Sequence, residues 1–214
     1  MSWQAASRRR VESSSTGRIR TSLRISCTFM TPTIRREARD CEDASMTTIA
    51  VVTGNPKPQS RTHGVALAVA DAVATALRAP ADRLVIDLAD HAPRLFDWSD
   101  PELTRLNNEV AAADVAIFAS PTYKASYTGL LKAFLDRYGN NGLVGVTAVG
   151  VMTGGWPGHL LAVEVHLRPV LVELGASVPA RGVYVTEPEL ADLDKAVATW
   201  AAAAVPLITR ALGQ

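Results

Sequence analysis

The chain has few groups that could support disulfide or metal chemistry. Its 214 residues include only two cysteines, Cys27 and Cys41, and both precede residue 46. Of its four histidines, His159 and His166 would lie about 10.5 Å apart along a helix, too far to bind one metal ion. The chain after residue 45 is therefore expected to lack a disulfide, a thiol nucleophile and a metal site, which is typical of a cytoplasmic protein.

Several sequence motifs are also absent. The chain has no Gly-Lys-Ser/Thr phosphate loop, no G-x-G-x-x-G turn, no H-E-x-x-H pair and no G-x-S-x-G elbow. A P-loop NTPase, a Rossmann dehydrogenase, a zinc protease and a serine hydrolase are thereby disfavoured. No apolar run could span a bilayer, and the formal net charge is only +1, so we expect neither a membrane nor a nucleic acid as partner.

Charge is distributed unevenly along the chain. Residues 1–45 hold nine arginines against five acids, are rich in serine and threonine, and show no sustained apolar period. Such a segment cannot bury enough apolar surface to offset its ordering entropy, so we predict a basic, disordered extension over 1–45 and one domain over 46–214. A transit peptide is one alternative for the extension. We favour Met46 as the natural first residue.

After Met46, short β-branched runs alternate with longer amphipathic stretches, which indicates βαβ units and a parallel sheet. Apolar stripes at helical spacing run from Ala66 to Leu77 and from Leu160 to Leu174, where Gly175 is expected in the left-handed conformation. An alanine-rich stretch, Glu189–Leu212, predicts a last helix. The five predicted strands are Thr48–Val52, Arg83–Asp87, Val115–Ala119, Val144–Val151 and Ser177–Val185.

Right-handed crossovers between five such strands predict an α/β fold, a flavodoxin-like three-layer sandwich whose parallel sheet has the order 2-1-3-4-5. In that order, the direction in which successive strands are added to the sheet reverses between strands 1 and 3. A ligand is therefore expected at the carboxyl ends of these strands, in the loops after Val52 and Ala119.

The loop after the first strand carries groups that suit a small anion. A helix is expected to begin near Ser60 or Arg61, and its free N–H groups favour a bound phosphate. Ser60 and Thr62 add hydroxyls, Asn55 an amide, and Lys57 and Arg61 positive charge. A capped helix with two solvated cations is the alternative interpretation.

Two later loops offer features that suit a flat ring. Pro121, Thr122 and Tyr123 make a stiff turn with an aromatic side chain, and Gly154 and Gly155 let the backbone approach a planar ligand. A helix N-cap with core tyrosines is the alternative for the first of these loops. Beyond the second strand, Asp87, Asp90 and His91 are expected in a solvated loop, and Leu95, Phe96 and Trp98 are candidates for a dimer contact.

Long runs in these loops resemble a known family, the NADPH-dependent FMN reductases of flavodoxin fold. The resemblance covers about Thr48 to Thr186 and is strongest to flavin reductase components of two-component alkanesulfonate monooxygenase systems. It rests on the run 120–132, SPTYKASYTGLLK, and on TGG at 153–155 followed by HLLA at 159–162.

The resemblance implies FMN and NADPH, or NADH, as cofactors, a partner monooxygenase, and a homodimer or homotetramer. Tyr127 resembles an inserted residue that widens a helix at a subunit contact, as a π-bulge would. In the first loop, Asn55 and Lys57 replace the usual serine and arginine of a Gly-Ser-Pro-Arg motif. The cofactor-binding residues implied are Asn55, Lys57, Ser60, Arg61, Thr62, Pro121, Thr122, Tyr123, Lys124, Thr153, Gly154 and Gly155.

The expected reaction is hydride transfer from nicotinamide to FMN, in which the cofactors carry the chemistry and no side chain acts as acid or base. Tyr123 and Lys124 are expected to position the ring. Two other functions stay open: an FMN-bound reductase of a quinone, azo compound or chromate, and a flavodoxin-like electron carrier. The carrier is disfavoured because such proteins dock through strongly acidic surfaces.

Overall fold

The structure is a computed structural model, and it describes residues 47–77 and 82–213. The predicted extension over 1–45 lies outside the described residues and stays a prediction. Within the described part, five parallel strands form one sheet with the order β2-β1-β3-β4-β5. This confirms the predicted flavodoxin-like order. The strands are β1 (Thr48–Thr53), β2 (Asp82–Asp87), β3 (Val115–Pro121), β4 (Thr147–Gly154) and β5 (Val183–Thr186).

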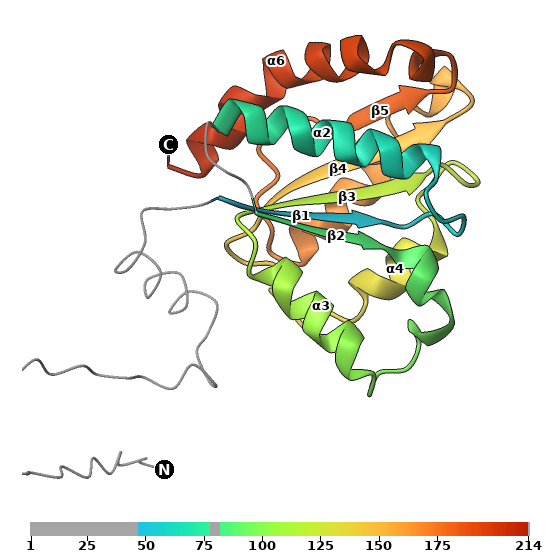
Figure 1. Cartoon of the computed structure of the whole chain (residues 1–214), viewed down its shortest axis with the longest axis vertical. Coiled ribbons are helices and arrows are strands. Elements are labelled where there is room, and N and C mark those ends of the chain that lie inside the picture. The colour runs from blue at the N-terminus through green and yellow to red at the C-terminus, as the bar shows by residue number, and fades with distance from the viewer. Residues whose placement is uncertain (1–46, 78–81, 214) are drawn as a thin grey trace, which may run out of the picture.

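Helices cover both faces of the sheet (Figure 1). Helices α2 and α6 lie together on one face, and α3, α4 and α5 with a π-helical turn, η4, lie on the other. The helices are α2 (Arg61–Leu77), α3 (Pro101–Ala111), α4 (Gly129–Leu135), α5 (Arg168–Glu173) and α6 (Leu193–Ala211), and the shorter turns are η2 (Leu88–Arg94), η3 (Pro157–His159), η4 (Val163–Leu167) and η5 (Pro188–Asp192).

The central strands β1, β3 and β4 are buried on both faces because they belong to two hydrophobic cores. In β1, Ala50 and Val52 pack towards α3 and α4, whereas Ile49 and Val51 pack towards α2 and α6. Successive side chains of a strand point to opposite faces, so a strand between two helical layers must be apolar throughout. This is why the strand runs read as continuous apolar stretches in the sequence.

The last two strands differ from their predicted bounds. The predicted Val144–Val151 is shifted to Thr147–Gly154. The predicted Ser177–Val185 is wrong over most of its length, because only Val183–Thr186 forms β5 and Ser177 makes a single bridge to Thr147. Pro179 lies between the two, and proline has no N–H to donate to a sheet.

Two helical segments also differ from the sequence analysis. Helix α3 was not predicted, although Asp100 caps it by accepting a hydrogen bond from Leu103 N and Pro101 begins it, which are ordinary helix-start signals. The stripe from Leu160 to Leu174 is not one regular α-helix, because it consists of a turn at 160–161, the π-helical η4 and the short helix α5. Gly175 does end it at φ +87°, as predicted.

The expected widening of a helix at Tyr127 is wrong. Tyr127 precedes α4, whose N-cap is Thr128, so it lies in a loop rather than in a helix. The π-helical turn of the described residues lies instead at Val163–Leu167, next to Pro169. Proline cannot donate the backbone hydrogen bond that an α-helix would need there, which favours a local change of helical period.

Surface features qualify two further expectations. Leu95 is a core residue, 1% exposed, and not a contact candidate, whereas Phe96 and Trp98 are 76% and 63% exposed.

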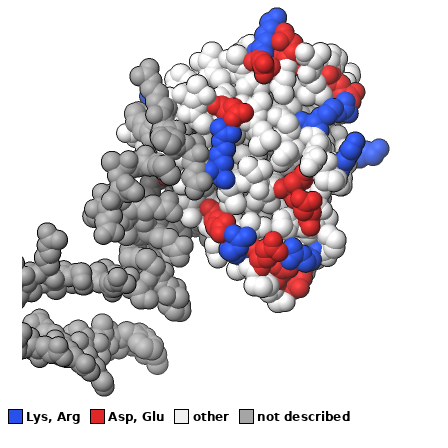
Figure 2. Space-filling model, in the orientation of Figure 1, with Lys and Arg blue, Asp and Glu red and all other residues white. Residues whose placement is uncertain are grey.

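On the face in Figure 2, basic and acidic side chains are interspersed among wide uncharged areas, so that face offers no broad basic patch of the kind that nucleic acid binds. Across residues 47–77 and 82–213, no helix has the length and apolarity needed to cross a bilayer.

Candidate functional site

The carboxyl ends of four strands meet along one edge of the sheet. The parallel register pairs Thr53 with Ala119, Pro121 with Thr153, and Gly154 with Thr186. The loops that follow β1, β3, β4 and β5 therefore begin side by side. The chain reverses its direction of winding between β1 and β3, and open α/β sheets bind ligands at that point.

The loop between β1 and α2 is shaped by hydrogen bonds to two side chains. Asn55 Oδ1 accepts from Lys57 N at 2.9 Å, which closes a local turn. Gln59 takes φ +50°, a conformation unfavourable for a residue with a Cβ, and its N–H donates to Asp87 Oδ2 at 2.9 Å. Asp87 was expected in a solvated loop. Instead it stabilises this loop from the end of β2.

Helix α2 begins where the loop ends, with two buried hydroxyl groups. Ser60 Oγ accepts from His63 N at 3.2 Å and so acts as the N-cap, and Ser60 and Thr62 are 7% and 2% exposed. The first amides of a helix have no partner within it, and the helix dipole adds positive potential there. The start of α2 is thus suited to a phosphate group.

Thr153, at the end of β4, connects the three predicted loops. Its hydroxyl lies 2.7 Å from Thr62 Oγ1, and Thr62 Oγ1 in turn accepts from Asn55 Nδ2 at 3.3 Å. The carbonyl of Thr153 accepts from Thr122 N at 2.7 Å. Residues from the loop between β1 and α2, the loop after β3 and the loop after β4 are therefore in direct contact, although Thr62 and Thr153 are 91 positions apart in the sequence.

The loop after β3 forms a tight turn with an exposed aromatic side chain. Tyr123 and Ser126 exchange backbone hydrogen bonds of 2.8 and 3.1 Å. The two residues between them, Lys124 and Ala125, take φ +53° and +66°, as both central residues of a type I′ turn must. Tyr123 is 53% exposed at its tip. Two non-glycine residues in this conformation store strain, a recurrent feature of binding sites.

Two features beside this turn fit a ligand with a flat polar ring. The hydroxyl of Thr122 is buried, and within the described part of the chain it has no hydrogen-bond partner. Such orphaned groups are rare and point to a partner that is absent. At Gly154 a Cβ would overlap the Tyr184 hydroxyl and lie 3.3 Å from Thr122 Cβ. A larger residue at this position would therefore displace Tyr184 or Thr122.

The loop after β4 places an indole ring near the same edge. Trp156 is 61% exposed, meets the His159 ring edge-to-face at 5.0 Å between centroids, and accepts at its carbonyl from Tyr184 Oη at 3.1 Å. A Cβ on Gly158 would overlap the Trp156 ring.

Two cations flank the start of α2, and one of them has a partner that the sequence did not suggest. Lys57 is exposed in the loop. Arg61 is also exposed and forms a 2.5 Å ion pair with Glu187, which follows β5. The structure thus places all twelve predicted residues at this edge and adds Asp87 and Glu187. Neighbouring residues in the sequence do not indicate a role for Asp87 or Glu187, because each contacts a residue that is distant in the sequence.

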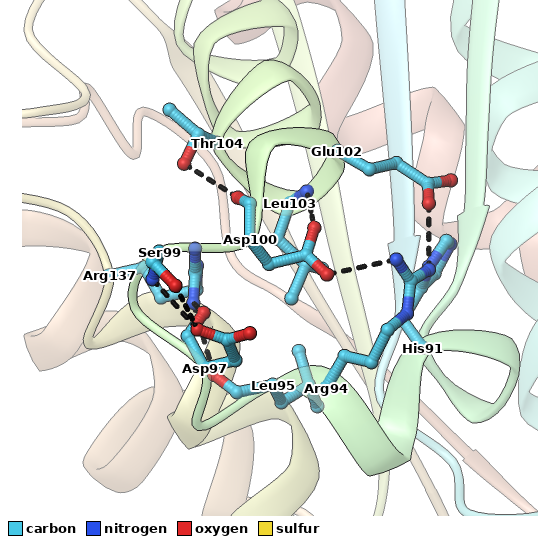
Figure 3. Close-up of polar contacts among 10 residues, drawn as sticks. All are labelled: His91, Arg94, Leu95, Asp97, Ser99, Asp100, Glu102, Leu103, Thr104 and Arg137. Atoms are coloured by element: carbon cyan, nitrogen blue, oxygen red, sulfur yellow. Dashed lines mark hydrogen bonds and ion pairs between the residues drawn. The ribbon is translucent and has the colours of Figure 1, made fainter.

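A polar network holds the segment between β2 and α3 in place (Figure 3). Arg94 pairs with Asp100 at 2.9 Å and Glu102 at 2.7 Å, and Arg137 donates to the carbonyls of Leu95 and Asp97. The hydrogen bond to Glu102 raises the pKa of Arg94, and the bond from Leu103 N, with the charge of Arg94, lowers the pKa of Asp100.

The sheet order and the helix-capped loop at its switch point define a flavodoxin-like α/β protein. Residues 47–189 match the family model described as NADPH-dependent FMN reductase, which is more than half of the chain. The chain belongs to this family. Membership confirms the predicted family.

Individual relatives agree with the family assignment. The FMN reductase (NADPH) of Escherichia coli K12 is 37% identical over 95 residues, which are 44% of this chain and 50% of that protein. The FMN reductase (NADPH) of Pseudomonas aeruginosa PAO1 is 32% identical over 151 residues, 68% of this chain and 78% of that protein. The apo crystal structure of the NADH:FMN oxidoreductase EMOB superposes with a TM-score of 0.63 at 30% identity, over 73% of this chain and 89% of that one. The chain thus spans half the length of the first relative and most of the other two.

Proposed function

We propose that this chain reduces FMN with NADPH or NADH at the edge formed by the loops after β1, β3 and β4. The observation that carries the proposal is the 2.7 Å contact between Thr62 and Thr153. It joins the anion-binding start of α2 to the glycine-containing loop after β4. A mononucleotide needs both kinds of surface, one for its phosphate and one for its ring.

The predicted residues fall into two groups with different roles. The phosphate group would be held by the start of α2 and the loop before it, through Asn55, Lys57, Ser60, Arg61 and Thr62. The ring would lie between the turn after β3 and the loop after β4, and it would contact Pro121, Thr122, Tyr123, Lys124, Thr153, Gly154 and Gly155. The unpartnered hydroxyl of Thr122 supports this assignment.

FMN, held by the start of α2 and by the loops after β3 and β4, would supply the redox chemistry of hydride transfer. The chain contributes position and electrostatics. The strained turn at Lys124 and Ala125 would position Tyr123 beside the ring. No side chain needs to move a proton.

The test is NADPH and NADH oxidation by purified protein at varied FMN concentration. Thr62→Val removes the hydroxyl shared by Asn55 and Thr153 and leaves buried polar groups unpaired, at a cost of about 1–3 kcal/mol. We therefore expect the KM for FMN to rise roughly tenfold or more. The control is Thr75→Val, because the exposed Thr75 hydroxyl bonds only within α2, to Asp71 O. Equal behaviour of the two variants would contradict the proposed site.

The same assay separates the rival functions. Saturable dependence on added FMN supports a reductase that releases reduced flavin, as a supplier of a partner monooxygenase must. Turnover of a quinone, azo compound or chromate by a yellow protein without added FMN supports the alternative reductase. A protein that binds FMN but oxidises neither dinucleotide is an electron carrier.

We also propose a cytoplasmic homodimer or homotetramer. Large apolar side chains are exposed from the turn before η4 to the end of α5, where Leu161, Val165 and Val172 are 58%, 57% and 53% exposed. Apolar side chains gathered along one segment are typical of contact surfaces. Light scattering after gel filtration gives the mass directly, and a monomer at micromolar concentration would contradict this part of the proposal.

A further inference from the structure

Glu187 is an acid at the edge of an otherwise anion-binding site. It follows β5 directly, and its N–H donates to Gly154 O at 3.0 Å, which attaches it to the loop after β4. Its carboxylate lies 2.5 Å from the guanidinium of Arg61. Glu187 Oε2 also lies 3.7 Å from the position that a Cβ on Gly155 would take. The ion pair therefore connects the start of α2 to the loop after β4, beside the proposed phosphate site.

The other acid of this segment has a different role. Glu189 Oε2 accepts from Thr186 N at 2.8 Å and from Thr186 Oγ1 at 2.6 Å, so it closes a local turn. Those hydrogen bonds lower the pKa of Glu189 and keep it ionised in that position. Glu187 accepts no such local bond among the hydrogen bonds of the described residues, and its carboxylate is directed to Arg61.

A carboxylate and a phosphate compete for the same guanidinium group. Arginine presents a planar set of donors that suits both anions, and it binds either one through parallel hydrogen bonds. Arg61 is the first residue of α2, adjacent to the Ser60 cap, so its guanidinium is within the region where a phosphate would bind. In the structure that guanidinium is already paired with Glu187.

We propose that Glu187 competes with the FMN phosphate for Arg61 and thereby weakens flavin binding, so that FMN exchanges readily. This inference rests on the proposed function. The pair is solvent-exposed, with side chains 70% and 53% accessible, so its effect on affinity is modest and depends on salt. A modest reduction in affinity is what a protein that treats FMN as an exchangeable substrate requires.

The experiment compares FMN with riboflavin, which lacks the phosphate, by fluorescence titration. Glu187→Gln is expected to lower the Kd for FMN about three- to fivefold at low ionic strength, and to leave the Kd for riboflavin unchanged. The difference should shrink as salt is raised. Glu109→Gln is the control, because Glu109 also forms an exposed ion pair, with Arg105 on α3. Glu187→Ala should give the same tightening.

A double variant tests the route through Arg61. In an Arg61→Gln background, Glu187→Gln should no longer tighten FMN binding, since the contested cation is gone. Equal tightening of FMN and riboflavin, tightening that persists without Arg61, or no tightening in either Glu187 variant would each overturn the inference. Failure of the unmodified protein to bind FMN at all would instead contradict the proposed function.

Discussion

Two neighbouring glycines of the loop after β4 differ in the space around them. A Cβ on Gly154 would overlap the Tyr184 hydroxyl, whereas on Gly155 the nearest atom would be Glu187 Oε2 at 3.7 Å. We predict that Gly154→Ala displaces Tyr184, lowers the free energy of unfolding by about 1–3 kcal/mol and weakens FMN binding, and that Gly155→Ala does not alter stability. Urea unfolding and FMN titration of both variants check this. Equal stability of the two would show that Tyr184 moves freely.

Single residues were predictable where a local pattern carries the chemistry. Ser60 and Thr62 stand at a helix start after a strand, and Gly154 and Gly155 form a doublet after another, so each could be proposed from its neighbours. Asp87 and Glu187 could not. Their partners, Gln59 and Arg61, are distant in the sequence, and only the sheet order brings each pair together.

Among the elements, the turn after β3 stores measurable strain. Ala125 takes φ +66°, a conformation that costs a residue with a Cβ about 1–2 kcal/mol relative to glycine. Ala125→Gly is therefore expected to raise the free energy of unfolding by about 1 kcal/mol. Ala72→Gly, inside helix α2, should lower it by about the same amount. Chemical denaturation of the two variants gives opposite signs if the turn is strained as described.

The segment between β2 and α3 predicts sensitivity to acid. The pKa of Asp100 is lowered in the folded state, first by its bond from Leu103 N, so its contribution to stability is complete above the unfolded value of 3.8 and is lost as pH falls through the lower folded value. The unfolding temperature should thus fall below about pH 4. Asp100→Asn keeps a capping oxygen but no titratable group, and its decline should be shallower. Asp90→Asn, on η2, is the control. A decline of the same slope in Asp100→Asn would contradict this role.

Element types were easier to predict than element limits. The runs of β1 and β3 are apolar throughout because these strands are buried on both faces. The apolar stripe of α2 reflects burial of one face, and the structure agrees with all three predictions. The limits of β5 and the division of Leu160–Leu174 into η4 and α5 depend on Pro179 and Pro169 in their tertiary setting. Helix α3 was missed although Leu103, Leu106 and Val110 recur at helical spacing and Asp100 caps it, because most of its other residues are polar.

At the scale of the whole molecule, the sheet order could be predicted from the alternation of strands and helices along the chain. Right-handed crossovers leave few arrangements for five parallel strands, and the switch point then locates the ligand. The three loops could be assigned to one site because all of them lie at the switch point, and not because of any single motif. Oligomeric state follows from no such rule and therefore stays a prediction.

The folded domain is predicted to begin at Met46. The family match begins at residue 47, β1 begins at Thr48, and every proposed ligand contact lies beyond Thr53. A chain that begins at Met46 should therefore keep the FMN affinity and the unfolding temperature of the full chain. A chain that begins at Val51 is the control, because it loses half of β1 and both hydrogen bonds of 2.9 Å from Thr48 to Asp114. The shorter chain should fail to fold. Weaker FMN binding by the Met46 chain would show that residues 1–45 contribute to the site.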